Sequence, residues 1–398
     1  MNEPQAASPA ALPQPLGASK DSAGRADAWM LWAIWLSTWF SPLKLNIGLN
    51  LSFEFMLAYL LVIYYLLVGR LSIGQVVGIL GLGMIAMLDY ARAQDPKVFM
   101  FLGFALVNVS MVKLVLHPVA SAQRWSQLFL LVPMLAVLMR FLMPELGGID
   151  GHDQTTVGVE VVQRFNLLGY ESNSLAIMMT MLMGAVLAGV GQLKLIWRLA
   201  YSLFCIAVVG ATFSRTGIFA VIALLLYFTF FSRSGSRPII LLMLCCILGV
   251  GIMLSDLGPI LEVIANRASA FNYFEDERGS ILIERLKELQ QSLSLFLFGR
   301  GFMTLGASDN SILALMHGYG YLGAFVAVTC LLLSSGVARG KVRWYPQLAG
   351  ISIPIFFYLL TADVFGQAKV IGCFYCLMGL HHVLNDKHIR CGSNQGLQ

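Results

Sequence analysis

Long apolar blocks separated by short polar turns are the feature that most limits what this chain can fold into. A helix needs a block of about 20 apolar residues to cross the hydrocarbon core of a bilayer. A membrane barrel would instead show alternation over segments of about 10 residues, a pattern that the sequence lacks. Because backbone polar groups in lipid must bond within their own segment, helices are the remaining solution. The sequence therefore predicts an all-α integral membrane protein.

The composition supports the same class of protein. Hydrophobic residues make up 58% of the 398 residues and charged residues only 12%. The average soluble chain is roughly 45–50% apolar and about 25% charged. The net charge of +5 comes from residues in loops between apolar blocks, with no basic stripe interleaved with aromatics. Binding to nucleic acid is therefore not expected.

About twelve spans form a predicted membrane domain over 29–384, between a disordered tail over 1–28 and a second tail over 385–398. The spans lie near 29–43, 50–69, 74–91, 98–117, 125–143, 174–192, 197–212, 215–232, 238–257, 310–336, 346–364 and 368–384. The first tail is rich in Ala, Pro and Ser and lacks the apolar region of a signal peptide. Most loop arginines and lysines fall on one side, which places both termini in the cytoplasm.

Two long loops, about 144–173 and 258–309, then lie outside. The larger one separates the ninth and tenth spans, and its leucines over 282–296 recur at the spacing of one helical face. Such an amphipathic helix is expected to lie at the membrane surface or to cap a cavity. The sequence shows no internal repeat and no paired, interrupted helices, which are typical of transporters.

Two polar clusters precede spans on the predicted outer side. Arg164, Glu171 and Asn173 run into one span, and Arg215 lies in a very short turn between two others. Guanidinium groups match phosphate or carboxylate geometry, so both arginines are candidate anion-binding residues. The alternatives are a helix cap at Asn173 and an arginine that snorkels to the interface.

Two further clusters lie in and after the large outer loop. Arg278 precedes the amphipathic stretch, and 299–301 (Gly-Arg-Gly) follows it, where glycines permit close backbone approach. Asp309 and Asn310 open the tenth span, where both look like helix N-cap residues, and Asp309 is also a candidate catalytic group. His317 shares their helical face, and a histidine inside a membrane helix is costly unless it is paired or faces a cavity.

Four short patterns in this order also define a resemblance. They comprise an arginine, glycine and asparagine before a span, a Ser-Arg-x-Gly turn, an arginine ahead of a Gly-x-Gly, and an Asp-Asn span start followed by Gly-x-x-Gly. The matching residues are Arg164, Gly169 and Asn173; Ser214, Arg215 and Gly217; Arg278, Gly299 and Gly301; and Asp309, Asn310, Gly320 and Gly323. Over roughly residues 160–325 the chain thus resembles the O-antigen polymerase and O-antigen ligase superfamily of Gram-negative bacteria.

The resemblance implies a metal-independent, cofactor-free glycosyltransferase of the bacterial inner membrane. It would polymerise undecaprenyl-diphosphate-linked oligosaccharide repeat units into O-antigen, capsular polysaccharide or exopolysaccharide at the periplasmic face. A chain-length regulator and a flippase are the implied protein partners. The acidic pair Asp276-Glu277 is adjacent and lacks metal-ligand spacing, so the residues themselves imply no metal.

The resemblance also suggests roles for the site residues. Arg164, Arg215 and Arg278 would neutralise the diphosphate, and Asn173, Arg300 and Asn310 would help to bind the substrate. Asp309 or Glu171 would act as the general base, with His317 as a third candidate.

Two departures from the family pattern matter. The ligase branch has a histidine where Asp309 stands, which favours a polymerase, and Glu171-Ser172-Asn173 replaces an Asn-Pro-Asn pattern. The alternatives that stay open are a ligase that transfers glycan to lipid A core and a polysaccharide-related transporter.

Overall fold

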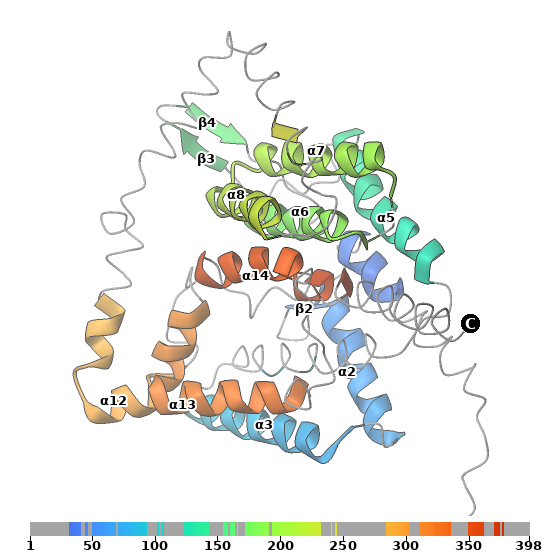
Figure 1. The fold of residues 1–398 in the computed structure, drawn as a ribbon. Coiled ribbons are helices and arrows are strands. Elements are labelled where there is room, and N and C mark those ends of the chain that lie inside the picture. Colours follow the sequence, from blue (N-terminus) through green and yellow to red (C-terminus); the bar gives the residue numbers. More distant parts are fainter. Residues whose placement is uncertain are drawn as a thin grey trace, which may run out of the picture.

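The fold is seen in a computed structural model that describes residues 32–40, 44–46, 50–68, 71–93, 102, 106, 122–142, 154–157, 160–163, 165, 172–190, 193–231, 240, 243–244, 284–301, 311–335, 349–361, 370–374 and 376–377. These residues are mainly helical, as predicted (Figure 1). Two antiparallel hairpins were not predicted: β1 (Lys44–Asn46) pairs with β2 (Asn50–Ser52), and β3 (Gln154–Val157) pairs with β4 (Glu160–Gln163). Each strand has only three or four residues, which is too short for a clear alternating pattern.

The helices follow the apolar blocks of the sequence. They are α2 (Phe53–Leu67), α3 (Ile73–Ala93), α5 (Ala122–Leu142), α6 (Ser172–Leu187), α7 (Leu195–Ala211), α8 (Arg215–Phe230), α12 (Leu293–Phe298), α13 (Ser311–Ser335) and α14 (Ala349–Thr361). Further helical turns cover 32–40 and 284–289. Glycine and polar residues end most of these blocks, which is why the predicted and observed boundaries lie close together.

Two helices in the described part of the chain are long and apolar enough to cross a membrane. These candidate spans are Ile73–Ala91 within α3 and Ala314–Leu333 within α13. Other apolar helices, among them Ser126–Leu142 and Arg215–Phe230, have only 10–17 residues, whereas a full crossing takes about 20. The predicted total of twelve spans is therefore not established. Most of the predicted spans 98–117 and 238–257 lies outside the described residues.

Helix α6 is the centre of the main bundle, which we call the α6 bundle and which consists of α6, α7, α8 and α14 (Figure 1). Every α6 residue from Ser174 to Leu187 is buried, so the helix is apolar on all sides, as expected for an internal helix. Close contact with α14 depends on glycine, since a Cβ on Gly184 would overlap the carbonyl of Gly350. Ser174 and Tyr358 join the same two helices through hydroxyl groups 2.6 Å apart.

Helices α3 and α13 form a second pair, below α14 in Figure 1. They approach closely at Gly81, where a Cβ would lie 2.7 Å from Sγ of Cys330. Their outward faces carry exposed large apolar side chains, such as Ile73 and Met84 on α3 and Phe325 on α13. Contiguous exposed apolar surface of this kind suits contact with lipid.

Helix α13 is broken at Gly320, although the sequence predicted one continuous span over 310–336 and no interrupted helices. Gly320 has φ 66° and ψ −178°, a conformation that is essentially restricted to glycine. Figure 1 shows the two parts of α13 meeting at an angle. The apolar pattern runs unchanged through the break, so hydropathy gave no sign of it.

Candidate functional site

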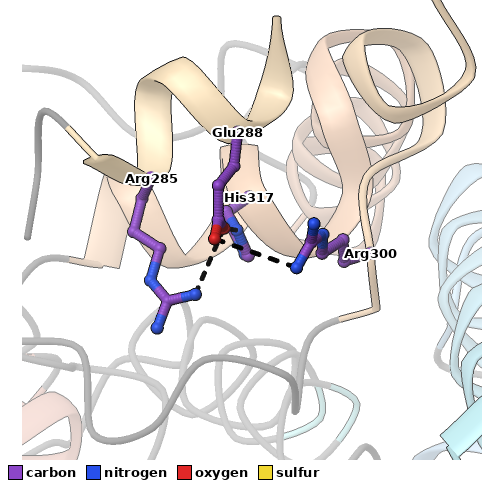
Figure 2. A network of polar contacts seen from close by, with 4 residues as sticks. All are labelled: Arg285, Glu288, Arg300 and His317. Carbon is purple, nitrogen blue, oxygen red and sulfur yellow. Dashed lines mark hydrogen bonds and ion pairs between the residues drawn. The ribbon is translucent and has the colours of Figure 1, made fainter. Parts of the chain in front are cut away.

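Four charged or titratable side chains meet beside the break in α13, and we call them the ionic cluster (Figure 2). Oε2 of Glu288 lies 2.9 Å from Nε2 of His317 and 3.2 Å from Nη1 of Arg285. Nη1 of Arg300 lies 3.8 Å from the other carboxylate oxygen, Oε1. One carboxylate therefore holds two guanidinium groups and one imidazole from three separate elements.

The predicted amphipathic helix over 282–296 is in fact two short helices, 284–289 and α12. They are separated because Ser292 is extended, with φ −150° and ψ 152°, and starts α12 as its N-cap by accepting the N–H of Leu295. On the first helix Arg285 and Glu288 are three residues apart and so share a face. The turn between the two helices lets the chain return towards α13 with Arg300.

The Gly-Arg-Gly loop at 299–301 crosses the broken helix backbone to backbone. Gly299 has φ 66° and ψ −173°, and a Cβ there would overlap Gly318, while a Cβ on Gly320 would overlap Leu297 and Phe298. Neither position therefore accommodates another residue without strain.

The crossing also satisfies backbone groups that the break leaves unpaired. In a continuous helix the carbonyls of His317 and Gly318 would accept N–H groups four residues later. Here they accept the N–H of Arg300 at 3.0 Å and of Gly301 at 2.8 Å. The loop thus completes the hydrogen bonding of α13, which matters most in an apolar setting.

Burial is graded across the ionic cluster. The side chain of His317 is 0% exposed and that of Glu288 is 18%, whereas Arg285 and Arg300 are 29% and 40% exposed. The hydrogen bond from His317 lowers the pKa of Glu288; partial burial opposes this shift, and the Arg285 hydrogen bond and Arg300 charge reinforce it. Glu288 is therefore ionised at neutral pH, and an ionised carboxylate only accepts hydrogen bonds.

The protonation of His317 follows from that contact. Since Glu288 accepts, Nε2 of His317 carries the proton, and in a neutral imidazole Nδ1 is then left with a lone pair. Nδ1 is buried and has no hydrogen-bond partner in the part of the chain that the structure describes. An imidazole held by a carboxylate through one nitrogen, with the other nitrogen open, has the arrangement of a general base.

Two other predicted site residues belong to the α6 bundle. Arg215 opens α8 after Ser214, whose side chain caps the helix by accepting the N–H of Gly217 at 3.2 Å. A Cβ on Gly217 would lie 2.6 Å from the Cβ of Ala176, so that glycine lets α8 approach α6. Arg215 itself is partly exposed and has no ion-pair partner among the described residues.

Asn173 lies in the first turn of α6, next to the residue that bonds Tyr358. In Figure 1, α14 lies between α6 and α13. The described structure thus brings Arg300 and His317 together but leaves Arg215 and Asn173 on other helices.

Five predicted site residues lie outside the described residues, namely Arg164, Glu171, Arg278, Asp309 and Asn310. Their roles stay predictions. Sequence reasoning did not identify Glu288 or Arg285 as site residues, although both lie on the polar face of the predicted amphipathic stretch. The available signal was His317, a buried histidine that required a partner.

Neither a scan against models of known protein families nor a search of curated proteins gives a match for this chain.

Proposed function

We propose that this chain is a membrane glycosyltransferase that polymerises undecaprenyl-diphosphate-linked oligosaccharide repeat units at the periplasmic face of the bacterial inner membrane. The observation that carries the proposal is the 2.9 Å contact between His317 and Glu288, flanked by Arg285 and Arg300. It joins a base held by a carboxylate to two cationic groups that suit a leaving diphosphate.

The reaction assigns one role to each group. The acceptor hydroxyl attacks the anomeric carbon of the donor glycan, and the bond from that carbon to the diphosphate oxygen breaks. The hydroxyl proton passes to Nδ1 of His317, while Glu288 stabilises the resulting imidazolium. The diphosphate leaves with the electron pair of the broken bond, and the guanidinium groups of Arg285 and Arg300 neutralise it.

A lipid-linked donor fits the location of the ionic cluster. His317 lies near the start of the candidate span Ala314–Leu333, so a diphosphate held there would have its lipid alongside an apolar helix. Because Nδ1 of His317 is buried in this structure, the acceptor hydroxyl reaches it through a local opening that keeps the contact of His317 with Glu288. Asp309 remains a second candidate for the base from the sequence.

The test is polymer formation by the purified full chain in lipid vesicles supplied with one lipid-diphosphate repeat unit. The unaltered chain should give a ladder of products, and His317→Ala should leave single repeats. Glu288→Gln should slow the reaction by about 10²-fold, the lower end of what a general base contributes. The double variant should be no slower than His317→Ala, because the two residues act as a unit.

Glu284→Gln is the matched control, since Glu284 is exposed on the same short helix. It should polymerise normally, and all variants should insert at equal abundance. A normal ladder from His317→Ala would reject His317 as the base and move the search to Asp309. Lipid A core offered as the acceptor separates a ligase from a polymerase.

A proton-coupled transporter is a second candidate, favoured by the break in α13. Interrupted helices with ionisable residues mark substrate and ion sites in transporters. His317 and Glu288 meet at such a break. Proton-driven uptake of the lipid-linked saccharide without polymer, abolished by Glu288→Gln but not by Glu284→Gln, would favour this function.

A further inference from the structure

Helix α12 presents an unusual surface for a segment that the sequence places in a polar outer loop. Its residues are Leu293–Phe298, with the sequence LSLFLF. Leu293 is 74% exposed and Phe298 is 51% exposed. With Phe296, three large apolar side chains on so short a helix lie on the surface and not in the protein core.

The position of α12 is fixed by its contacts with α13. The rings of Phe296 and Tyr321 stack with centroids 4.3 Å apart, and the Gly299–Gly320 crossing follows directly. Tyr321 comes seven residues after Ala314, the first residue of the candidate span. Helix α12 therefore packs against residues of the candidate span itself, directly after the break at Gly320.

The exposed surface of α12 continues onto α13. Beyond the break, Tyr321, Leu322 and Phe325 are exposed on the same helix that α12 contacts. Figure 1 shows α12 lying against the bend of α13. Phe296 and Tyr321 are both partly exposed and stack on each other, so they join the apolar surfaces of α12 and α13 next to the break.

The backbone of this region also suits an apolar solvent. The N–H groups of Arg300 and Gly301 pair with the carbonyls of the break, and the N–H of Gly299 pairs with Leu295. The ionic cluster neutralises its carboxylate with two arginines. Irregular backbone is tolerated at membrane depth only when its polar groups are satisfied in this way.

We propose that α12 and the Gly-Arg-Gly loop form a membrane-inserted hairpin whose exposed apolar side chains, Leu293 and Phe298, contact lipid acyl chains. The arginines of the ionic cluster would then lie at headgroup level, where their long side chains reach the interface. This inference rests on membrane residence, the premise of the proposed function, but not on glycosyl transfer.

The experiment is photo-crosslinking in the full chain. A benzophenone amino acid replaces Leu293, Phe298 or Gln290 in separate variants, reconstituted in vesicles of phosphatidylethanolamine and phosphatidylglycerol. Mass spectrometry then measures lipid adducts at each position. Gln290 is the matched control, because it is exposed in the turn between the two short helices of the same segment.

We expect several-fold more lipid adduct at Leu293 and Phe298 than at Gln290. Equal or lower yields at both apolar positions would overturn the proposal, as would adducts mainly with a second copy of the chain. Two positions are used because a bulky residue at Phe298 could disturb the adjacent crossing, whereas Leu293 is freely exposed. The readout needs no glycan chemistry, so it can fail while polymerisation holds, or hold while polymerisation fails.

Discussion

The α6 bundle and the region around the α13 break are built on opposite principles. In the bundle, α6 is buried on all sides, and Gly184 and Gly217 allow helices to approach closely. At the break, a partly exposed carboxylate holds three other titratable side chains, and two glycines let two backbones cross. The bundle is held together by close packing of its side chains and backbones, whereas the break is held by ion pairs and by backbone conformations that glycine adopts.

Stability and chemistry therefore lie in different parts of the molecule. Removing or adding volume in the bundle should affect the whole fold, because packed interiors have few voids to absorb the change. Altering the break should release segment 284–301 while leaving the bundle folded, because local units open independently.

The largest effect should come from Gly184→Ala in the bundle. Its Cβ would overlap the backbone carbonyl of Gly350, so α6 and α14 must move apart. We expect destabilisation of about 3 kcal/mol or more, at the upper end of overpacking costs. The measurement is the thermal unfolding midpoint of the purified chain in detergent.

Gly210→Ala in α7 is the matched control, since a Cβ there meets nothing within 4 Å. It should be neutral or stabilise the protein by about 0.5–1 kcal/mol through helix propensity. Equal unfolding midpoints for the two variants would contradict the view that the bundle depends on close glycine contact.

The second effect should come from Gly320→Ala at the break. A Cβ there would overlap the backbone of Leu297 and Phe298, and the glycine-only conformation costs about 1–3 kcal/mol for other residues. We expect faster hydrogen exchange at the N–H groups of Arg300 and Gly301, which lose their partners on α13. The unfolding midpoint should change much less than in Gly184→Ala.

Gly83→Ala on α3 controls for this change, because a Cβ there meets nothing within 4 Å. It should leave exchange in segment 284–301 unchanged. A loss of the whole fold in Gly320→Ala would show that the break and the bundle are one cooperative unit.

The same contrast explains how much of the fold the sequence could predict. The apolar blocks predicted the helices well, because burial on all sides leaves a continuous hydrophobic run such as that of α6. The break in α13 could not be found in this way, since it depends on the conformation of Gly320 and on a loop that crosses it. A hydrophobic pattern identifies a buried segment but not what contacts it.

The candidate site was predictable in part for a related reason. His317 stood out because a buried imidazole needs a partner, but that partner, Glu288, lies 29 residues away on a different element. Helical periodicity placed Glu288 on a polar face without indicating what the face meets. The predicted Ser-Arg-x-Gly turn is a further case: Ser214 caps α8, and Gly217 lets α8 approach α6.

A third prediction concerns pH and sharpens the contrast in charge. The folded-state pKa of Glu288 is lowered from an ordinary value of 4.5 by its contact with His317 and the arginines. Because its pKa is lowered when segment 284–301 is packed on α13, ionised Glu288 stabilises that packing. The contribution is fully present at pH values above the ordinary pKa and is lost as the pH falls through the folded-state pKa. The contribution of Glu288 to the protection of segment 284–301 should thus be fully present above about pH 5 and decline below about pH 4.5.

Hydrogen exchange, corrected for the intrinsic rate at each pH, measures this dependence. Glu288→Gln should remove it by abolishing the titrating group, while exchange in α6 should follow the same course in both proteins. If protection from exchange declined in α6 at the same pH as in segment 284–301, the segment would not be packing on α13 independently of the α6 bundle.

The smallest effects should come from two serine N-caps, one in each region. Ser214 accepts the N–H of Gly217 and Ser292 accepts that of Leu295, both at 3.2 Å, but Ser214 is buried and Ser292 is exposed. Ser214→Ala leaves a buried donor unpaired and should cost about 1–2 kcal/mol. Ser292 lies at the start of the hairpin, where interfacial water can replace the hydroxyl, so Ser292→Ala should cost about 0.5 kcal/mol, detected only in local exchange. Unfolding midpoints and exchange rates measured on both variants check the ranking. If Ser292→Ala proves the more damaging change, the Ser292 cap lies too deep for interfacial water to replace its hydroxyl.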